Sequence, residues 1–406
     1  MLLRLAWRNI WRNPRRTGVI LTAVVVGVWT MVLLGALMRG MLTGMVANGI
    51  ATLTGDIQIH ARGFHADPSV QHTLADPAPA LAELARLAPP GAAWASRVRV
   101  PGIVMNARHT RGVTLVGIQP EKEARVSFYG GAVTEGRGLL PADPLGVVVG
   151  RALLDRLQTK LGRKLVIMSQ EAGGGMASRA FRIVGVFQAE MEGTEKQFVF
   201  ISLDQAQQML NLGHGISEIA VLLPQHQQHP PLAAALRQTL PPGLEVLTWL
   251  ELLPMMQVFL QMFDFFNLLY YLVVFTAMAF GLVNTTLMAV YERMREFGLL
   301  KALGQKPWGI MRQVLAEAFM ILAVGVVIGD GLAFATIAWL GQHGIDLSSL
   351  AAGVEFSGMT RIIRPELAAA DVWLANGVVI ILGLAVSFYP AAKAARFTPV
   401  EALGRV

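Results

Sequence analysis

Residues 265–304 read FFNLLYYLVVFTAMAFGLVNTTLMAVYERMREFGLLKALG. The first 27 of these residues carry no charge, and five charged residues follow within the next ten. At about 1.5 Å per residue, a helix over the uncharged part is about 40 Å long, which exceeds the roughly 30 Å of a bilayer's hydrocarbon core. The stretch therefore predicts a membrane-spanning helix followed directly by a charged loop.

Three further apolar runs are long enough to cross a bilayer: residues 18–38, 318–345 and 372–392. Only 15% of the chain is charged, against about 25% in an ordinary soluble domain. The composition predicts a membrane protein with four transmembrane α-helices. A cleaved signal peptide is the alternative for the first run, but this run is longer than the usual apolar core of about 7–15 residues. The chain has no cysteine, which excludes a disulfide framework and a thiolate nucleophile.

The net charge of +7 is not spread over the chain. Segments 1–16, 292–317 and 393–406 together hold 13 basic and four acidic residues, and each borders an apolar run. Short basic segments beside membrane helices mark the cytoplasmic side, so we expect both termini and the 292–317 loop in the cytoplasm. Segments 39–264 and 346–371 then lie outside. This distribution indicates a membrane partner and no nucleic acid.

Asp330 interrupts the third apolar run. An acid at the bilayer centre costs about 3 kcal/mol, which the surrounding Leu, Ile, Val and Phe residues offset. Asp330 is either a relay or coupling site inside the membrane or a residue near the wet outer end of its helix, and we favour the second interpretation. Gly325 and Gly329, at i and i+4, predict close helix packing in the same span.

Residues 1–13 have the pattern of an amphipathic helix that ends before Pro14. Its apolar side includes Trp7 and Trp11, and a stripe of arginines lies beside it. We expect this helix in the inner headgroup layer of the membrane, the alternative being an ordinary basic flank.

Segment 39–264 is long enough for one or two domains and reads as mixed α/β. Residues 163–169 and 180–188 predict paired strands, joined by a loop that contains Gly173, Gly174 and Gly175. The chain has no serine-hydrolase elbow, no H-E-x-x-H zinc motif and no Walker A motif. We therefore expect no catalytic residue and no metal site, and His214, His226 and His229 are interpreted as loop histidines. If ATP is used, another chain hydrolyses it.

Met and Phe residues gather where the second span begins. Their soft side chains suit a cleft that accepts acyl chains, although plain helix packing explains them equally well. The candidate cargo residues are Met256, Phe259, Met262, Phe263 and Phe266.

Two motifs carry a family resemblance. ERMREFGLLKALG at 292–304 resembles the coupling-helix pattern of ABC-transporter permeases of the FtsX/MacB/lipoprotein-releasing superfamily. YPAAKAAR at 389–396 with PVEAL at 399–403 resembles the ending of the same family, and AWRNIWRNPRRT at 6–17 resembles its opening. The layout is most like that of the lipoprotein-releasing (LolC/LolE) permeases.

The resemblance implies a large external α/β domain with porter and sabre lobes between helices 1 and 2. It also implies a pair of permeases bound to two ATPase subunits, which hold the ATP and Mg, so that this chain binds no cofactor. Contact with the ATPase is implied for Glu296, Phe297, Gly298, Leu299, Leu300, Lys301, Ala302, Leu303 and Gly304. Contact with a periplasmic lipoprotein carrier is implied for a loop in the place of Gly173, Gly174, Gly175 and Met176, the alternative being a flexible hairpin tip.

These expectations define the predicted layout in the bacterial inner membrane. The segments are the cytoplasmic amphipathic helix 1–16, first span 17–40, periplasmic domain 41–255, second span 256–291, coupling loop 292–309, third span 310–341, periplasmic loop 342–371, fourth span 372–392 and cytoplasmic tail 393–406. The leading functional hypothesis is ATP-driven extraction of lipoproteins from the outer leaflet by mechanotransmission. The alternatives are MacB-like efflux of peptides or amphiphiles and an FtsX-like signalling scaffold without cargo.

Overall fold

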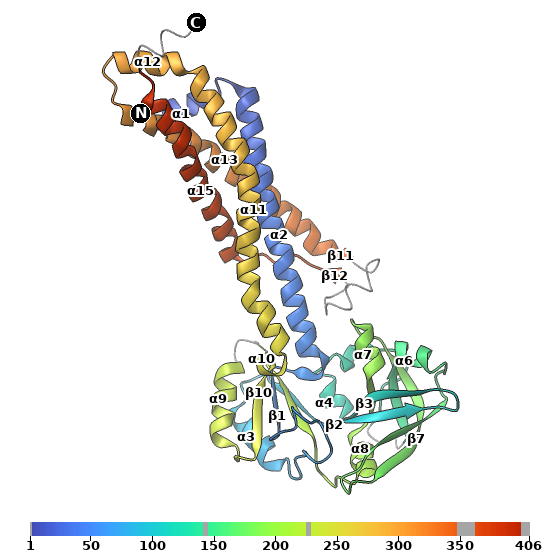
Figure 1. Ribbon diagram of the computed structural model, residues 1–406. Coiled ribbons are helices and arrows are strands. Elements are labelled where there is room, and N and C mark those ends of the chain that lie inside the picture. The colour runs from blue at the N-terminus through green and yellow to red at the C-terminus, as the bar shows by residue number, and fades with distance from the viewer. Residues whose placement is uncertain (1, 141–144, 225–228, 347–361, 399–406) are drawn as a thin grey trace. The chain divides into compact units, whose positions relative to one another are not determined.

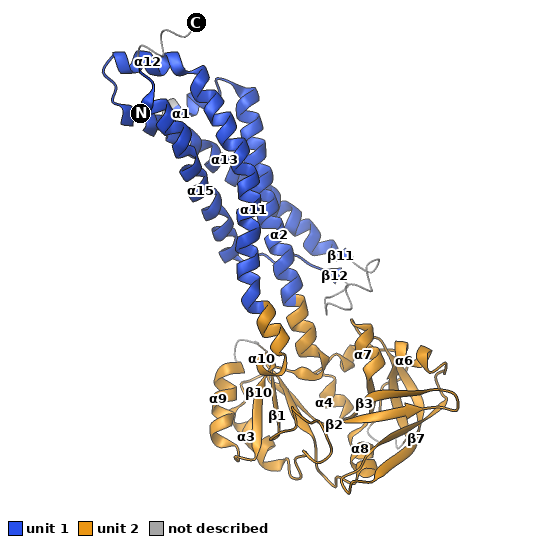
Figure 2. Ribbon diagram, in the orientation of Figure 1, with its two compact units in different colours: residues 1–43, 260–347, 362–406 blue, residues 44–259, 348–361 orange. Residues whose placement is uncertain are grey.

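The computed structural model describes residues 2–140, 145–224, 229–346 and 362–398. The chain forms two compact units, which Figure 2 distinguishes by colour. The helical unit comprises residues 1–43, 260–347 and 362–406, and the α/β unit comprises residues 44–259 and 348–361. The C-terminal motif at 399–403 and His226 lie outside the described residues.

The helical unit is built from long apolar helices (Figure 1). The helices are α1 (Leu2–Ile10), α2 (Pro14–Gly49), α11 (Pro254–Glu292), α12 (Met294–Ala302), α13 (Pro307–His343) and α15 (Ala369–Arg396). Two short strands, β11 (Ile345–Asp346) and β12 (Ile362–Ile363), form an antiparallel pair. Four helices are long and apolar enough to cross a membrane: Pro14–Thr54, Pro254–Glu292, Pro307–His343 and Ala369–Arg396. The prediction of four membrane helices, with a large domain before the second, is confirmed.

Small residues bring α13 against α2. A Cβ atom on Gly325 would lie 2.5 Å from Val24 Cγ1, and one on Gly329 would lie 2.7 Å from Val28 Cβ. Both distances are below any real contact, so only glycine permits this approach. The predicted close packing of this helix is confirmed, and the partner is α2.

The N-terminal helix α1 packs onto the bundle by one face. Ala6 and Ile10 are buried, whereas Trp7 and Trp11 remain about half exposed with their rings 5.8 Å apart. The Thr17 hydroxyl donates to the Ile10 carbonyl at 2.6 Å, which closes the corner between α1 and α2. The predicted helix is present as Leu2–Ile10, but it ends three residues before the predicted end at residue 13, and residues 11–13 form a turn.

The α/β unit contains a sheet with the strand order β10-β1-β9-β2-β3-β8-β5-β7-β4, with β6 paired to β2 and β7. The strands are β1 (Ile57–Ala61), β2 (Ala93–Met105), β3 (Thr110–Ile118), β4 (Val133–Gly136), β5 (Gly146–Gly150), β6 (Lys164–Gln170), β7 (Met176–Phe187), β8 (Phe198–Ser202), β9 (Glu218–Leu222) and β10 (Leu244–Thr248). The pairs β3–β8 and β5–β7 are parallel, and the other pairs are antiparallel. The predicted pairing of the two strands around the glycine loop is confirmed by β6 and β7.

Helices flank the sheet in two lobes (Figure 1). The helices of this unit are the π-helical turn η1 (Ile50–Thr54), α3 (Ala78–Leu87), α4 (Pro120–Glu123), α5 (Tyr129–Ala132), α6 (Arg151–Arg156), α7 (Glu192–Gln197), α8 (Leu203–Leu210), α9 (His229–Thr239) and α10 (Trp249–Leu252). Strand β2 belongs to both lobes, because it pairs with β9 up to Arg97 and with β3 from Val98 onward.

A buried charge cluster lies where β2 changes partner. The Arg97 guanidinium bonds Glu123 and Glu218, and all three side chains are fully buried. Arg97 also donates to the Leu53 carbonyl at the end of η1. Burial acts to lower the pKa of Arg97, but the two carboxylates outweigh it and raise the pKa above its ordinary value. The cluster therefore joins both lobes to η1.

Candidate functional site

Helix α12 contains most of the predicted ATPase-contact segment and lies at the same end of the helical unit as α1 (Figure 1). Its buried face centres on Phe297, which is 1% exposed. This ring belongs to a cluster drawn from α11, α13 and α15: Val290, Ile310, Met311, Val314, Ala391 and Ala394. Helix α12 therefore packs against a cluster shared with three of the long helices, and Phe297 is its most deeply buried side chain.

The end of α12 is fastened by polar contacts. Lys301 Nζ donates to the carbonyl oxygens of Ala395 at 2.6 Å and Phe397 at 2.7 Å, at the end of α15. Gly304 follows the helix with a φ of +93°, a conformation that favours glycine after a helix end. The predicted helix stop at Gly304 and the restart at Pro307 are both confirmed.

The outer face of α12 is apolar and uncovered. Leu299 is 54% exposed and Leu303 is 78% exposed, and Ala302 lies beside them. Trp308, at the start of α13, is also exposed. Spacings of three and four residues place Leu299, Ala302 and Leu303 on one side of the helix. This face, here called the α12 knob, consists of Leu299, Ala302 and Leu303.

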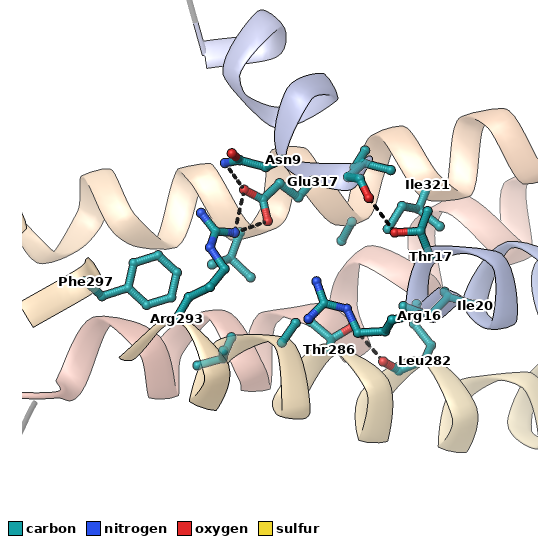
Figure 3. Close-up of a pocket in the computed structure, with 15 residues that line it drawn as sticks. Asn9, Arg16, Thr17, Ile20, Leu282, Thr286, Arg293, Phe297, Glu317 and Ile321 are labelled. Carbon is teal, nitrogen blue, oxygen red and sulfur yellow. Dashed lines mark hydrogen bonds and ion pairs between the residues drawn. The ribbon is translucent and has the colours of Figure 1, made fainter. Parts of the chain in front are cut away.

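Beneath α12 lies a small cavity of about 40 Å³ with polar and apolar walls. Figure 3 shows Asn9, Arg293 and Glu317 pointing toward one another at its side. Arg293 contacts Glu317 at 2.8 Å and Glu296 at 3.2 Å, and its guanidinium lies 5.1 Å from the centre of the Phe297 ring. Burial acts to raise the pKa of Glu296, but hydrogen bonds from Arg12 and Arg293 outweigh it, so this pKa lies below its ordinary value.

The predicted cargo residues differ in exposure. In the helical unit, Met262 and Phe266 of α11 are 43% and 45% exposed, whereas Phe263 is only 8% exposed. In the α/β unit, Phe259 is 49% exposed and Met256 is half-buried. Phe263 therefore lies in the packed interior of its unit, while the other aromatic side chains remain accessible.

One member of an ion pair lies over the Phe263 ring. Arg39 lies over its ring at 5.4 Å and donates to both carboxylate oxygens of Asp371, at 2.5 and 2.8 Å. Sequence reasoning missed this pair. A signal existed, because Arg39 directly follows the first apolar run and Asp371 directly precedes the fourth. Opposite charges at the ends of neighbouring spans are natural partners.

The glycine loop between β6 and β7 is a closed turn. Glu171 N donates to the Gly175 carbonyl at 2.9 Å, and Gly174 has a φ of +83°. Ala172 N donates to the Leu210 carbonyl at 3.0 Å, which ties the turn to the end of α8. Met176, the last residue of the predicted carrier-contact set, is 60% exposed. Met176 is therefore exposed to solvent beside a turn that is hydrogen-bonded to the end of α8.

Asp330 has a partner on a neighbouring helix. Asn376 Nδ2 of α15 donates to Asp330 Oδ2 at 2.8 Å. Asp330 is half-buried, and its other oxygen is buried without a hydrogen-bond partner. In the described parts of the chain, no group of three or more His, Asp or Glu residues is placed to hold a metal ion.

Comparisons with known proteins agree with this architecture. The MacB-like periplasmic core domain family matches residues 17–239, and the FtsX-like permease C-terminal family matches residues 268–399. The chain belongs to the FtsX/MacB superfamily of ABC-transporter permeases. The periplasmic core match covers α2 from Thr17 onward and the α/β unit through α9, and the FtsX match covers α12, α13, α15 and α11 from Leu268 onward.

Individual relatives of this FtsX/MacB permease differ in how much they share with it. The lipoprotein-releasing system transmembrane protein LolC of Neisseria meningitidis serogroup B is 22% identical over 74% of this chain and 75% of its own length. The macrolide export ATP-binding/permease protein MacB of Campylobacter fetus is 32% identical, but the match covers 30% of this chain and 17% of that protein. The periplasmic region of MacB from Actinobacillus actinomycetemcomitans aligns with half of this chain at a TM-score of 0.34 and 15% identity.

Proposed function

We propose that this chain is the permease subunit of a transporter that extracts lipoproteins or similar lipidated cargo from the outer leaflet of the bacterial inner membrane. A separate ATPase subunit, which holds ATP and Mg, supplies the energy, and a second permease chain completes the assembly. Both termini and α12 lie in the cytoplasm in this proposal. The observation that carries it is α12 itself, with its buried Phe297 and its exposed knob.

The two faces of α12 suit the transfer of force. An exposed apolar face on a short helix fits a groove in a partner protein. The buried Phe297 belongs to one cluster with residues of three long helices, so a displacement of the α12 knob acts on all three at once. Close-packed side chains transmit such a displacement, because interiors are dense and weakly compressible.

Two observations favour lipidated cargo. Phe259, Met262 and Phe266 leave large apolar side chains exposed on α11, as contact with acyl chains requires. The similarity to LolC covers three quarters of both chains, whereas the similarity to MacB covers a small part of that protein. In this proposal, the turn at Gly173, Gly174 and Gly175 with Met176 is a contact for a periplasmic carrier.

Reconstitution tests the proposal. The chain is purified with its co-expressed ATPase, placed in proteoliposomes with a fluorescent triacylated lipopeptide, and supplied with ATP. We expect ATP-dependent release of the lipopeptide to a soluble acceptor. Leu299→Asp should abolish release, while Leu161→Asp, which places the same charge on an exposed leucine of the α/β unit, should not. ATP hydrolysis without release of any acylated cargo would overturn lipoprotein extraction.

A separate experiment on spheroplasts of cells that express the chain tests orientation. Protease added from the periplasmic side of spheroplasts should cut within 41–255 and spare 292–309. Cleavage in the 292–309 loop under these conditions would contradict the orientation.

The second candidate is an FtsX-like scaffold that activates a periplasmic hydrolase without moving cargo. The absence of a catalytic motif in the sequence is compatible with either function. Replacing Met262 and Phe266 by serine distinguishes the two candidate functions. Loss of the apolar surface should stop cargo release but leave a signalling scaffold active.

A further inference from the structure

The three acidic residues of segment 292–317 all bond residues near the N-terminus. Arg16 contacts Glu292 at 2.6 Å, and Arg12 contacts Glu296 at 2.5 Å. The Asn9 side chain donates to Glu317 at 2.8 Å. These contacts join parts of the chain that lie about 300 residues apart in sequence; Arg16 and Glu292, for example, are 276 residues apart. We call Asn9, Arg12 and Arg16 the N-terminal bracket.

The bracket rests on a fixed corner of the chain. Thr17, in the first turn of α2 (Figure 3), bonds the last carbonyl of α1, and Ile10 is buried in the bundle. Residues 11–13 turn the chain between the two helices. Arg16 already belongs to α2, so its contact with Glu292 links the first long helix directly to the end of α11, next to α12.

Two of the three bracket contacts belong to one network, and the Arg16–Glu292 pair adjoins it along the chain, because Glu292 directly precedes Arg293. Arg293 bonds both Glu296 and Glu317. Each of these carboxylates also bonds one bracket residue, Arg12 at Glu296 and Asn9 at Glu317. Arg293 and Glu317 are nearly buried, with side chains 14% and 16% exposed, while Arg12 is 64% exposed. A single exposed ion pair contributes little, but a network around a buried pair is held together by its members.

We propose that the N-terminal bracket is a positioning element that makes α12 and the first long helix α2 move as one body. The inference rests on the proposed function, since it takes α12 as the point where force enters. Phe297 passes a displacement to α11, α13 and α15, and the bracket adds a polar connection to α2 beside the close packing of α13 on α2. Arg12 and Arg16 thus act through defined carboxylates on α12 and α11, beyond their contribution to the positive charge beside the membrane.

The test is a charge exchange at Arg16 and Glu292. The variants are Arg16→Glu, Glu292→Arg and the double exchange, with Arg15→Glu as the matched control. Arg15 is exposed and has no side-chain partner in the described part of the chain, so its reversal makes the same change in charge without breaking a bond. The control therefore accounts for any effect of charge on membrane orientation.

The first readout does not depend on transport. Because the chain has no cysteine, Trp11→Cys and Arg295→Cys give two unique sites for spin labels. We expect a single narrow distance distribution in the otherwise unchanged protein and in Arg15→Glu, a broad one in each single exchange variant, and a narrow one again in the double exchange. A distribution that stays narrow in Arg16→Glu would overturn the bracket.

The second readout is cargo released per ATP hydrolysed in proteoliposomes. Each single exchange should lower this ratio at least about threefold, as expected for two residues in direct contact, while ATPase binding stays unchanged. The double exchange should restore most of it. A double variant no better than the singles, or an equal loss in Arg15→Glu, would overturn the proposal. If no variant and no wild-type preparation releases cargo, the proposed function fails, and the spin-label result still decides whether the bracket holds α12 to α2.

Discussion

Arg97 donates two hydrogen bonds to Glu123, at 2.8 and 2.6 Å, with both side chains completely buried. The pair lies at the point where β2 passes from one lobe of the α/β unit to the other. Removal of one member leaves an uncompensated buried charge, which is far more costly than the loss of an exposed pair. The stability of the α/β unit therefore depends on this one arginine.

Arg97→Met should lower the free energy of unfolding of the α/β unit by about 3–5 kcal/mol. Arg86→Met, which breaks the exposed pair with Glu83, should cost at most about 1 kcal/mol. Urea denaturation of the full chain in detergent, followed by protease sensitivity of the α/β unit, measures both. Equal losses in the two variants would show that the buried cluster has no special role.

His60 makes the stability of the α/β unit depend on pH. Its side chain is buried, and burial lowers its pKa despite the Ala61 carbonyl and the carboxylates of Glu218 and Glu245, while His65 adds to the lowering. The unfolded chain therefore takes up a proton at His60 below pH about 6.5, where the folded chain does not. Stability is full above this pH and is lost as the pH falls toward the lower folded pKa, by at most about 1.4 kcal/mol per pH unit.

Melting temperatures measured from pH 7.5 to 5.5 test this dependence. His60→Leu should flatten the profile, and His214→Gln, at an exposed position, should leave it unchanged. A profile that persists in His60→Leu would assign the pH dependence to other groups.

Truncation of the buried Phe297 of α12 and truncation of the exposed Leu303 after it should have different effects. Phe297→Ala removes a buried ring and should destabilise the packing of α12 by about 3–5 kcal/mol. Leu303→Ala, at a side chain that is 78% exposed, should leave thermal stability unchanged and weaken binding to the ATPase. Thermal unfolding and a pull-down of the ATPase distinguish the two effects. Normal ATPase binding by Leu303→Ala would remove Leu303 from the proposed contact.

Asp330 should tolerate an amide. Asp330→Asn keeps an oxygen to accept from Asn376, so we expect cargo release within about twofold of the unchanged protein. Asp330→Leu deletes the acceptor and leaves the Asn376 amide unpaired, which should cost about 1–3 kcal/mol of stability. Loss of release in a well-assembled Asp330→Asn variant would instead assign the carboxylate a role in transport.

The exposed and buried phenylalanines of α11 should separate transport from stability. Phe266→Ser should reduce the release of acylated cargo with little change in thermal stability, because Phe266 is 45% exposed. Phe263→Ser should destabilise the helical unit by about 3 kcal/mol or more, because the ring is buried under Arg39. Lipopeptide binding and melting temperature measure the two effects, and a stable Phe266→Ser variant with full binding would exclude this residue from the cargo surface.

Local patterns predicted much of this architecture. Long uncharged runs are sufficient for membrane helices, because length and hydropathy alone decide whether a helix crosses a bilayer. Gly304 and Pro307 predicted where α12 stops and α13 starts, since the preferences of these residues act within one turn. The strands around the glycine loop were predicted for the same reason, as a hairpin pairs neighbouring segments.

Contacts between distant segments were decided only by the tertiary structure. The sequence placed Phe263 with the other Met and Phe residues of α11, but it is buried, and Arg39, which is bonded to Asp371, lies over its ring. Arg12 and Arg16 counted only as positive charges until the fold brought them to Glu296 and Glu292. Periodicity reports which face of an element is apolar, whereas the partner of that face depends on how segments hundreds of residues apart pack together. For this chain, local hydropathy and turn chemistry determined the helices, and long-range packing decided which charges and rings act together.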